Sequence, residues 1–387
     1  MVAMQNIKTG RLIVAAILAI FVYGVIAAML GTIMPSFTLT PEQKGNVALA
    51  QALGLVIASI SVGPLIDAKG KKTALVLGLA LITLSLFTLP NVSGYGLIAL
   101  LFFLMGVGGG IIVTAANALV SDIGENRRAP VLNLLNLFFG LGGLLTPFIA
   151  ANLLSDDTVK ILYFAAILAT VTFVAQVTTS MPGPTGEAGF KLSEVGLVLG
   201  RPSLYLLAML LFLYVSCEVG VWNWLKQYLI SRNVDAKTAG NILSLGFALG
   251  LLLGRVIVSR ILIRVSAITV TLFSAILMAA TTYLMLGTSD PTIAWIAVFC
   301  AGLSMAPVFP TTLAMVGDAF PRMTATAMGI VITSGWIGLA VSSPIIGSMA
   351  GENNANLRTA LLIIPGFSVA MIVVNLLLRP ALKPQKA

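Results

Sequence analysis

The sequence predicts an all-α polytopic membrane protein with twelve transmembrane helices in two six-helix repeats. Composition is the first reason: 58% of the 387 residues are hydrophobic and only 9% are charged, whereas soluble domains carry about 25% charged residues. The second is that long apolar runs recur along the chain, and a helix needs about 20 mostly apolar residues to cross a bilayer. The third is that segments of the first half recur in the second half at an offset of 196 residues.

Twelve apolar runs mark the expected helices. Only helices or closed barrels satisfy the backbone in lipid, and these runs are too continuously apolar for the alternating strands of a barrel. Pro307 and Pro310 can break the tenth helix. The predicted spans are residues 12–34, 44–66, 73–90, 95–121, 130–153, 159–179, 203–228, 238–262, 266–287, 291–316, 324–349 and 358–378.

The distribution of Lys and Arg predicts the orientation. With the N-terminus in the cytoplasm, 15 of the 22 basic residues fall in inner loops and tails and 6 in outer loops. Cytoplasmic loops carry the excess of Lys and Arg in membrane proteins. We therefore expect both termini to be cytoplasmic and the protein to lie in a bacterial inner membrane.

Two halves and a linker are predicted from the repeat and from one polar stretch. Residues 180–202 are rich in Gly, Pro and charge, which is typical of a loop. We expect an N-terminal half at 1–179, a cytoplasmic linker at 180–202 and a C-terminal half at 203–387. In such parallel-repeat proteins, substrate sites lie near the membrane midplane at the repeat interface. The offset relates residues 52–66 to 248–262, Gly24 to Gly220, Gly106 to Gly302 and Asp122 to Asp318.

Composition and motifs also exclude several function classes. The net charge of +9 lies in short loops rather than on one face, so we expect no nucleic-acid partner. Cys217 and Cys300 lie in apolar runs, which argues against a disulfide framework. The chain carries no nucleotide-binding loop, metal-ligand cluster or nucleophile–base arrangement. We expect no cofactor, no metal and no enzymatic activity.

The turn after the second predicted helix, "GPLIDAKGKK", carries a family resemblance. It contains Gly63, Asp67, Lys69, Gly70, Lys71 and Lys72. This resembles the helix 2–3 signature of the major facilitator superfamily. In that family the turn holds the outward-facing state, which implies gating roles for Asp67 and Lys71, with Arg127 or Arg128 as the partner. The alternative is that the basic turn only sets topology. Asp122 and Asp318, at the inner ends of helices 4 and 10, are expected to gate or cap.

Within that superfamily, "MPSF" (34–37), "TAAN" (114–117) and "RRAPVLNLLNLFFG" (127–140) resemble the fucose permease-like sugar:proton symporters. The resemblance implies a monosaccharide substrate and proton symport. Proton-coupled members carry acidic residues in helices 1 and 4, but the matching positions here are Gly31 and Val113. Sodium coupling and uniport therefore stay open.

Membrane-embedded amides and aromatics are candidate sugar ligands. Asn117 lies in helix 4, and Asn133 and Asn136 share a face of helix 5. Intramembrane polar side chains normally face the bundle interior or a cavity, and amides offer donors and acceptors to sugar hydroxyls. The alternative is that they tie helices together. The candidate stacking rings, for which lipid contact is the alternative, are Tyr23, Phe138, Phe139, Trp222 and Trp336.

Glu218 is the one acidic residue predicted well inside a span. Trp222 lies four residues further on, and Asn223 is adjacent to Trp222. A carboxylate at that depth can exchange a proton or accept hydrogen bonds from sugar hydroxyls, so we expect coupling or substrate binding. The alternatives are the outer surface or a pairing with Lys226. For Arg255 we expect extension to the cytoplasmic surface, the alternative being a pairing with Asp318 or near Glu218.

These observations predict a monomeric secondary transporter that takes up a monosaccharide with a proton by alternating access. A drug or metabolite exporter of the same superfamily is the second hypothesis; it predicts an apolar cavity with few hydrogen-bonding groups. A membrane-bound sensor or enzyme is the third, and the absence of catalytic clusters argues against it. The expected partners are a small-molecule substrate, a co-transported proton or sodium ion, and the lipid bilayer.

Overall fold

The computed structural model describes residues 2–123, 128–181, 183, 199–262, 264–288, 290–320 and 324–382. Within these ranges the regular elements are helices, with no strand. Eleven of the helices described there are long and apolar enough to cross a membrane, and α4 (Arg128–Asn152) adds the shorter apolar stretch Leu137–Asn152. The predicted all-α polytopic fold is confirmed.

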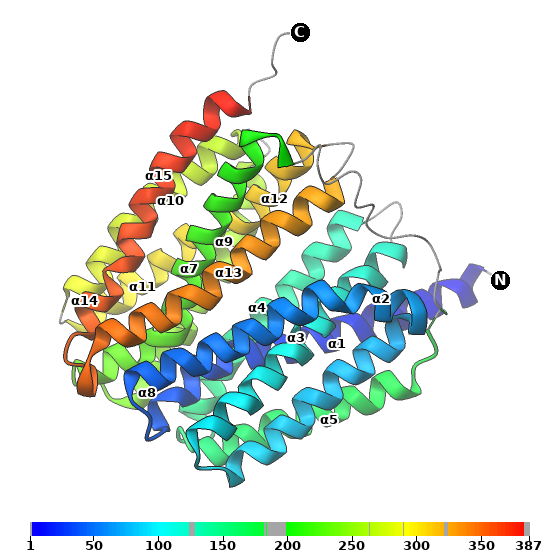
Figure 1. The fold of residues 1–387 in the computed structure, drawn as a ribbon, viewed down its shortest axis with the longest axis horizontal. Helices are drawn as coiled ribbons and strands as arrows, with labels where there is room; N and C mark the ends of the chain where they lie inside the picture. Colours follow the sequence, from blue (N-terminus) through cyan, green and yellow to red (C-terminus); the bar gives the residue numbers. More distant parts are fainter. Residues whose placement is uncertain are drawn as a thin grey trace. The chain divides into compact units, whose positions relative to one another are not determined.

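The chain forms two compact units. Unit 1 comprises Met1–Leu39 and Asn46–Glu187, and unit 2 comprises Thr40–Gly45 and Ala188–Ala387. In unit 1, α1 packs against α3, α4 and α5 (Figure 1). Its elements are α1 (Val2–Ile33), η1 (Met34–Ser36), α2 (Pro41–Thr88, whose first residues belong to unit 2), η2 (Leu89–Asn91), α3 (Tyr95–Ile123), α4 (Arg128–Asn152) and α5 (Thr158–Thr178).

Unit 2 is built around α7. This helix packs against α13 and α15, and α10 packs against α11 and α15 (Figure 1). The elements are α7 (Pro202–Ser231), α8 (Ala236–Asn241), η3 (Ile242–Ala248), α9 (Leu249–Ile261), α10 (Ala267–Gly287), α11 (Pro291–Met305), α12 (Val308–Ala319), α13 (Thr324–Ala350), η4 (Glu352–Asn354), α14 (Leu357–Leu361) and α15 (Ile363–Ala381).

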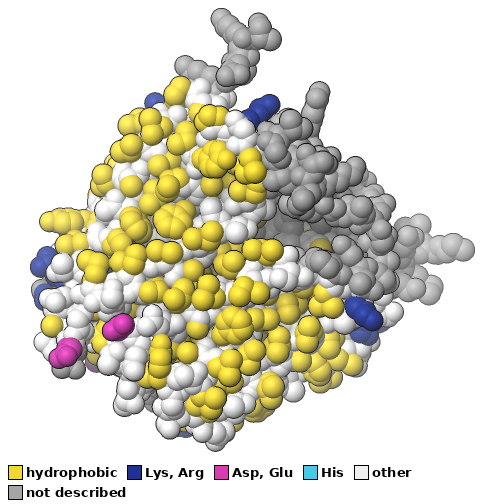
Figure 2. Space-filling model, viewed as in Figure 1, with side chains coloured by type: hydrophobic (Ala, Val, Ile, Leu, Met, Phe, Trp, Pro, Cys, Tyr) yellow, Lys and Arg dark blue, Asp and Glu magenta, His cyan; other side chains and the backbone are white. Residues whose placement is uncertain are grey.

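Large hydrophobic side chains are exposed along the spans. Ile60 is 64% exposed, Val171 62% and Phe273 61%. On the face shown in Figure 2, hydrophobic side chains are spread widely and the coloured charged groups lie near its margins. Soluble monomers rarely expose large contiguous apolar patches, so this surface fits contact with lipid chains.

Two glycine pairs show the internal repeat in three dimensions. In unit 1, a Cβ on Gly54 would overlap the carbonyl oxygen of Phe103, and one on Gly106 would overlap that of Gln51. Helices α2 and α3 therefore meet backbone to backbone, because small residues let membrane helices approach closely.

The same contacts recur in unit 2 at the offset of 196 residues. There a Cβ on Gly250 would overlap the carbonyl oxygen of Phe299, and one on Gly302 would overlap that of Phe247. Each of these residues is the repeat mate of a unit 1 residue in the matching contact. The predicted duplication is confirmed by the packing.

In three places the predicted runs are not simple straight helices. Helices 2 and 3 form the continuous element α2, which turns sharply at Gly70 with φ 81° and ψ 162°. That left-handed conformation is readily adopted only by glycine. Helix 8 contains a seven-residue π-helical segment, η3, that no sequence feature predicted. Helix 10 is interrupted between Met305 and Val308, as the proline at 307 predicted.

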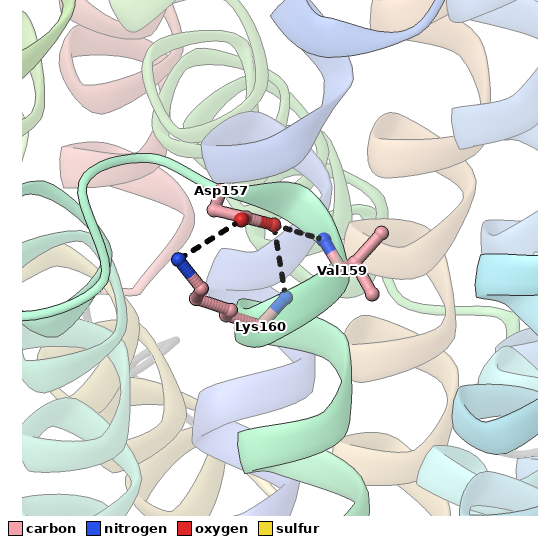
Figure 3. Close-up of polar contacts among 3 residues, drawn as sticks. All are labelled: Asp157, Val159 and Lys160. Carbon is pink, nitrogen blue, oxygen red and sulfur yellow. Dashed lines mark hydrogen bonds and ion pairs between the residues drawn. The ribbon is translucent and has the colours of Figure 1, made fainter.

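Asp157 caps the N-terminus of α5. Its Oδ1 accepts hydrogen bonds from the backbone N–H groups of Val159 (3.0 Å) and Lys160 (3.2 Å), and its Oδ2 lies 3.2 Å from the Lys160 ammonium (Figure 3). An N-cap carboxylate satisfies N–H groups that have no partner within the helix. The pKa of Asp157 is lowered, chiefly by the hydrogen bond from the Lys160 backbone N–H. The Lys160 ammonium and the Val159 backbone N–H lower this pKa further.

We expect Gly106→Ala and Gly302→Ala to lower thermal stability, because the added methyl group pushes two backbones apart. Overpacking of this kind costs about 1–3 kcal/mol. Gly96→Ala, in the first turn of α3 with nothing within 4 Å of its Cβ position, is the matched control. Thermal unfolding of the purified protein in detergent measures the three variants. A melting temperature for Gly106→Ala equal to that of Gly96→Ala would show that the close approach is dispensable.

We expect Asp157→Ala to lower the melting temperature at pH 7 and Asp157→Ser, which keeps a capping oxygen, to lower it less. The folded-state pKa lies below the usual 3.8, so the carboxylate stabilises the fold above pH 3.8 and loses this effect as pH falls through the lowered pKa. Melting curves of wild type and Asp157→Ala should therefore stay equally far apart at pH 7 and 5 and begin to converge at pH 3.5. A difference independent of pH would contradict this assignment.

Candidate functional site

Glu218 lies half-buried in α7, inside a membrane-spanning helix. Tyr214, one helical turn earlier, is fully buried. Both the Glu218 carboxylate and the Arg255 guanidinium from α9 are close enough to Tyr214 to interact with it electrostatically. A phenol, a carboxylate and a guanidinium therefore gather in the transmembrane part of unit 2.

Arg255 is half-buried, as a side chain that extends toward the cytoplasmic surface would be. It also interacts electrostatically with the fully buried Tyr214, and this interaction favours the alternative of a location near Glu218. A guanidinium is less costly at this depth when a carboxylate lies nearby.

Trp222 and Asn223 continue the polar side of α7. The ring of Trp222 meets Phe247 of η3 edge to face, with centroids 5.3 Å apart at 78°. Asn223 is buried, and its Nδ2 donates to Ser343 Oγ of α13 at 2.8 Å. This bond uses one of the two N–H donors of the amide, so Asn223 ties α7 to α13.

The end of α7 nearest Ser231 carries further polar ties. Gln227 Nε2 donates to Asn354 Oδ1 in η4. The hydroxyl of Tyr228 donates to the carbonyl of Leu286 at 2.9 Å, and Arg358 Nε donates to the same oxygen at 2.9 Å. Lys226, an alternative partner of Glu218, is only 2% exposed. This end of unit 2 is held by side chains rather than by apolar packing alone.

The predicted unit 1 ligands lie on α1, α3 and α4. Tyr23 is 6% exposed, its ring lies 5.4 Å from that of Phe139 at 34°, and a Cβ on Gly109 would overlap it. Tyr23 is therefore buried between helices, and the lipid-contact alternative is wrong. Asn117 is half-buried, and its Nδ2 donates to the carbonyl of Val113 in the same helix at 2.8 Å. The side chain of Asn136, on α4, lies outside the described residues.

The remaining predicted residues are described only in part. Trp336 is half-buried on α13, and Asp318 is exposed at the end of α12. Lys71 is 8% exposed and has a partner. The side chains of Asp67, Asp122, Arg127 and Arg128 lie outside the described residues. The gating prediction therefore stays a prediction.

Lys72 has a role that sequence reasoning missed. Its Nζ donates to the carbonyl of Val177 at 2.7 Å, one residue before α5 ends at Thr178. Cations are favourable near helix C-termini, where carbonyl groups lack partners. The basic turn at Gly70 thus ties α2 to α5 within unit 1.

Some residues that contact the candidate site residues of α7 could have been identified from the sequence, and others could not. Tyr214 precedes Glu218 by four residues, so helical spacing alone places both on one face. Ser343 and Phe247 contact α7 from other helices, and no spacing rule indicates such pairs. Among the described residues, no group of three or more Cys, Asp, Glu or His side chains could hold a metal ion.

The arrangement defines an integral membrane protein of two helical units with a charged cluster inside a span. The family model described as Major Facilitator Superfamily matches residues 12–300 and 225–387. The chain belongs to the Major Facilitator Superfamily and is a membrane transporter of that family, not an enzyme. The resemblance seen in the helix 2–3 turn is confirmed.

Two curated relatives show the range of the similarity. The chain is 24% identical over 352 residues to the "Glucose/mannose transporter GlcP" of Bacillus subtilis (strain 168), covering 84% of this chain and 85% of the relative. It is 22% identical over 228 residues to "Protein TsgA homolog" of Buchnera aphidicola, covering 58% of each. The match thus spans little more than half of the TsgA homolog.

Solved transporters share the fold. The nucleoside transporter NupG superposes with a TM-score of 0.79 at 14% identity, covering 96% of this chain and 99% of that one. The D-xylose-proton symporter gives 0.77 at 14% identity, covering 95% and 96%. The E. coli fucose:proton symporter FucP gives 0.66 at 18% identity, covering 95% and 98%. At these identities the likeness concerns the fold.

We expect the Asn223–Ser343 bond to stabilise unit 2. A double-mutant cycle of Asn223→Ala and Ser343→Ala should give a coupling energy of about 0.6 kcal/mol, with about 1.7 kcal/mol as the upper end for interhelical bonds in membranes. Thermal or denaturant unfolding in detergent measures it, with Ser334→Ala in place of Ser343→Ala as a control on the same helix. A coupling energy of zero would show that Asn223 is not held by Ser343.

Proposed function

We propose that the chain takes up a monosaccharide together with a proton by alternating access. It acts as a monomer in a bacterial inner membrane, with both termini in the cytoplasm. Its functional halves are residues 1–179 and 203–387, joined by a cytoplasmic linker at 180–202. The observation that carries this proposal is the Glu218 carboxylate inside a transmembrane helix, one turn from the buried Tyr214, with which the Arg255 guanidinium of α9 also interacts electrostatically. An intramembrane ionisable group is expensive and marks a substrate or ion pathway by default.

Glu218 is proposed as the coupling residue. Protonated, the carboxyl is neutral and donates one hydrogen bond; ionised, it accepts hydrogen bonds only. Gaining or losing one proton therefore changes what Tyr214 and Arg255 face. Gly31 and Val113 stand where the resemblance leads us to expect acids in helices 1 and 4. Proton coupling in this chain therefore requires a different acidic residue, and Glu218 is the candidate.

A sugar substrate is supported by chemistry and by relatives. Amides and a carboxylate offer hydrogen bonds to hydroxyl groups, and aromatic rings offer an apolar face. We propose Asn117, Asn136, Glu218, Trp222, Asn223, Tyr23 and Trp336 as substrate contacts, with Asp67, Lys71, Arg127, Arg128, Asp122 and Asp318 in gating. A relative named as a glucose/mannose transporter covers 84% of this chain.

Uptake into proteoliposomes tests the proposal. Labelled hexoses, pentoses, deoxysugars and nucleosides are offered with and without an inward proton gradient, and with a sodium gradient in parallel. We expect one sugar to accumulate with the proton gradient, by up to about tenfold per pH unit for one proton per sugar, since one pH unit is worth about 1.36 kcal/mol. Uptake that follows only sodium, or that ignores both gradients, would contradict proton coupling. Uptake of no sugar would favour a nucleoside importer or an exporter.

Glu218→Gln separates coupling from binding. We expect this variant to equilibrate sugar and to exchange labelled for unlabelled sugar, but to lose accumulation driven by the proton gradient. The glutamine keeps the size and acceptor oxygen of the side chain and cannot release a proton. Glu352→Gln, an exposed acid in η4, is the matched control and should accumulate like wild type. Unchanged accumulation by Glu218→Gln would remove this residue from the coupling mechanism.

A further inference from the structure

A cavity of about 170 Å³ lies in unit 1 between α1, α4 and α5. Its wall includes Phe21 and Met29 of α1, Thr146 and Ile149 of α4, and Phe164 and Leu168 of α5. The exposed surface of the cavity is apolar. An apolar cavity of about 150 Å³ stays dry and accepts a molecule such as benzene, so this one is suited to hydrocarbon.

The one hydroxyl in the wall is already satisfied. Thr146 Oγ1 donates to the carbonyl of Gly142 at 2.8 Å and lies 3.4 Å from that of Val25. The wall therefore offers no free donor to orient a sugar or any other polar ligand. This separates the cavity from the polar groups proposed for substrate binding.

The cavity is continuous with a lipid-facing surface of α5. Ala165 at its base is 2% exposed, whereas Phe164 in its wall is 42% exposed and the neighbouring Ile167 is 59% exposed. All three lie in the span Thr158–Thr178. In a membrane the molecules at this opening are lipids, whose acyl chains are as apolar as the wall.

A basic group lies at one end of the cavity. Lys160 directly precedes Ile161, a residue of the wall, and its side chain is 64% exposed in the first turn of α5 (Figure 3). Its pairing with Asp157 is an exposed one and contributes little to stability, so the ammonium can also turn to a phosphate. From Lys160 to Leu168 the helix rises about 12 Å, which places this group at the headgroup level and the cavity in the hydrocarbon of the same leaflet.

We propose that this cavity holds a segment of one acyl chain of a phospholipid from the leaflet next to the α4–α5 connection, with the phosphate beside Lys160. Three helices line the cavity, so an acyl chain bound there is held in one place. In this it differs from the lipids that surround every membrane protein. A second copy of this chain, or a small apolar molecule, is the competing occupant.

Photolabelling tests the proposal on the full chain in liposomes. The probe is phosphatidylglycerol with a diazirine in one acyl chain, and labelled peptides are mapped by mass spectrometry. We expect label on the wall residues of α1, α4 and α5, and a decrease of about fivefold, equivalent to about 1 kcal/mol, in Leu168→Trp, whose ring fills the cavity. Val171→Trp adds the same ring on the exposed side of α5 and should leave the label unchanged.

Three results would overturn the proposal. They are label spread evenly over all lipid-facing helices, label in the cavity that Leu168→Trp leaves intact, and protein–protein cross-links through α5 with no lipid label. If Leu168→Trp does not fold, Ala165→Leu tests the same filling of the cavity. Lys160→Glu should lower the labelling by phosphatidylglycerol but not by the neutral diacylglycerol bearing the same chain; equal labelling in both cases would contradict the phosphate contact.

Discussion

Close backbone contact at repeated glycines is the constraint on which much of this structure depends. Lipid chains are as apolar as the helices, so there is no hydrophobic driving force for membrane helices to associate, and close van der Waals packing must supply the association energy. At Gly54 and Gly106 in unit 1, and at their repeat mates Gly250 and Gly302 in unit 2, a side chain would overlap a carbonyl oxygen of the neighbouring helix. The same crossing built twice fixes the frame that holds the polar residues of each unit.

In unit 2 this frame allows α7 to carry polar groups along a membrane span. Glu218 lies with Tyr214 and Arg255, while Asn223 is bonded to Ser343. The first group is ionisable and the second is a neutral tie between helices. An ionisable side chain and a bond that holds two helices together thus lie little more than one helical turn apart on α7. Because Glu218 can gain or lose a proton and Asn223 cannot, Glu218 is the better candidate for the proposed coupling.

Unit 1 is different in character. Its aromatic contact between Tyr23 and Phe139, its helix-capping Lys72 and its apolar cavity between α1, α4 and α5 are built from packing and backbone capping. No charged cluster comparable to that around Glu218 is found among its described residues. Membership of the Major Facilitator Superfamily accounts for the shared architecture of the two units.

The fold class, the duplication and the turn around Gly70 could be predicted from the sequence, because span length, repeat offset and glycine's backbone freedom are local properties. The sequence also placed Glu218 in a span and predicted the break at Pro307. The folded structure was needed to show that Arg255 interacts with Tyr214, that Asn223 pairs with Ser343, that Tyr23 is buried and that helix 8 contains a π-helical segment. In a chain that is apolar on both its lipid and its core faces, periodicity does not tell one face from the other, so contacts between helices could not be read from spacing.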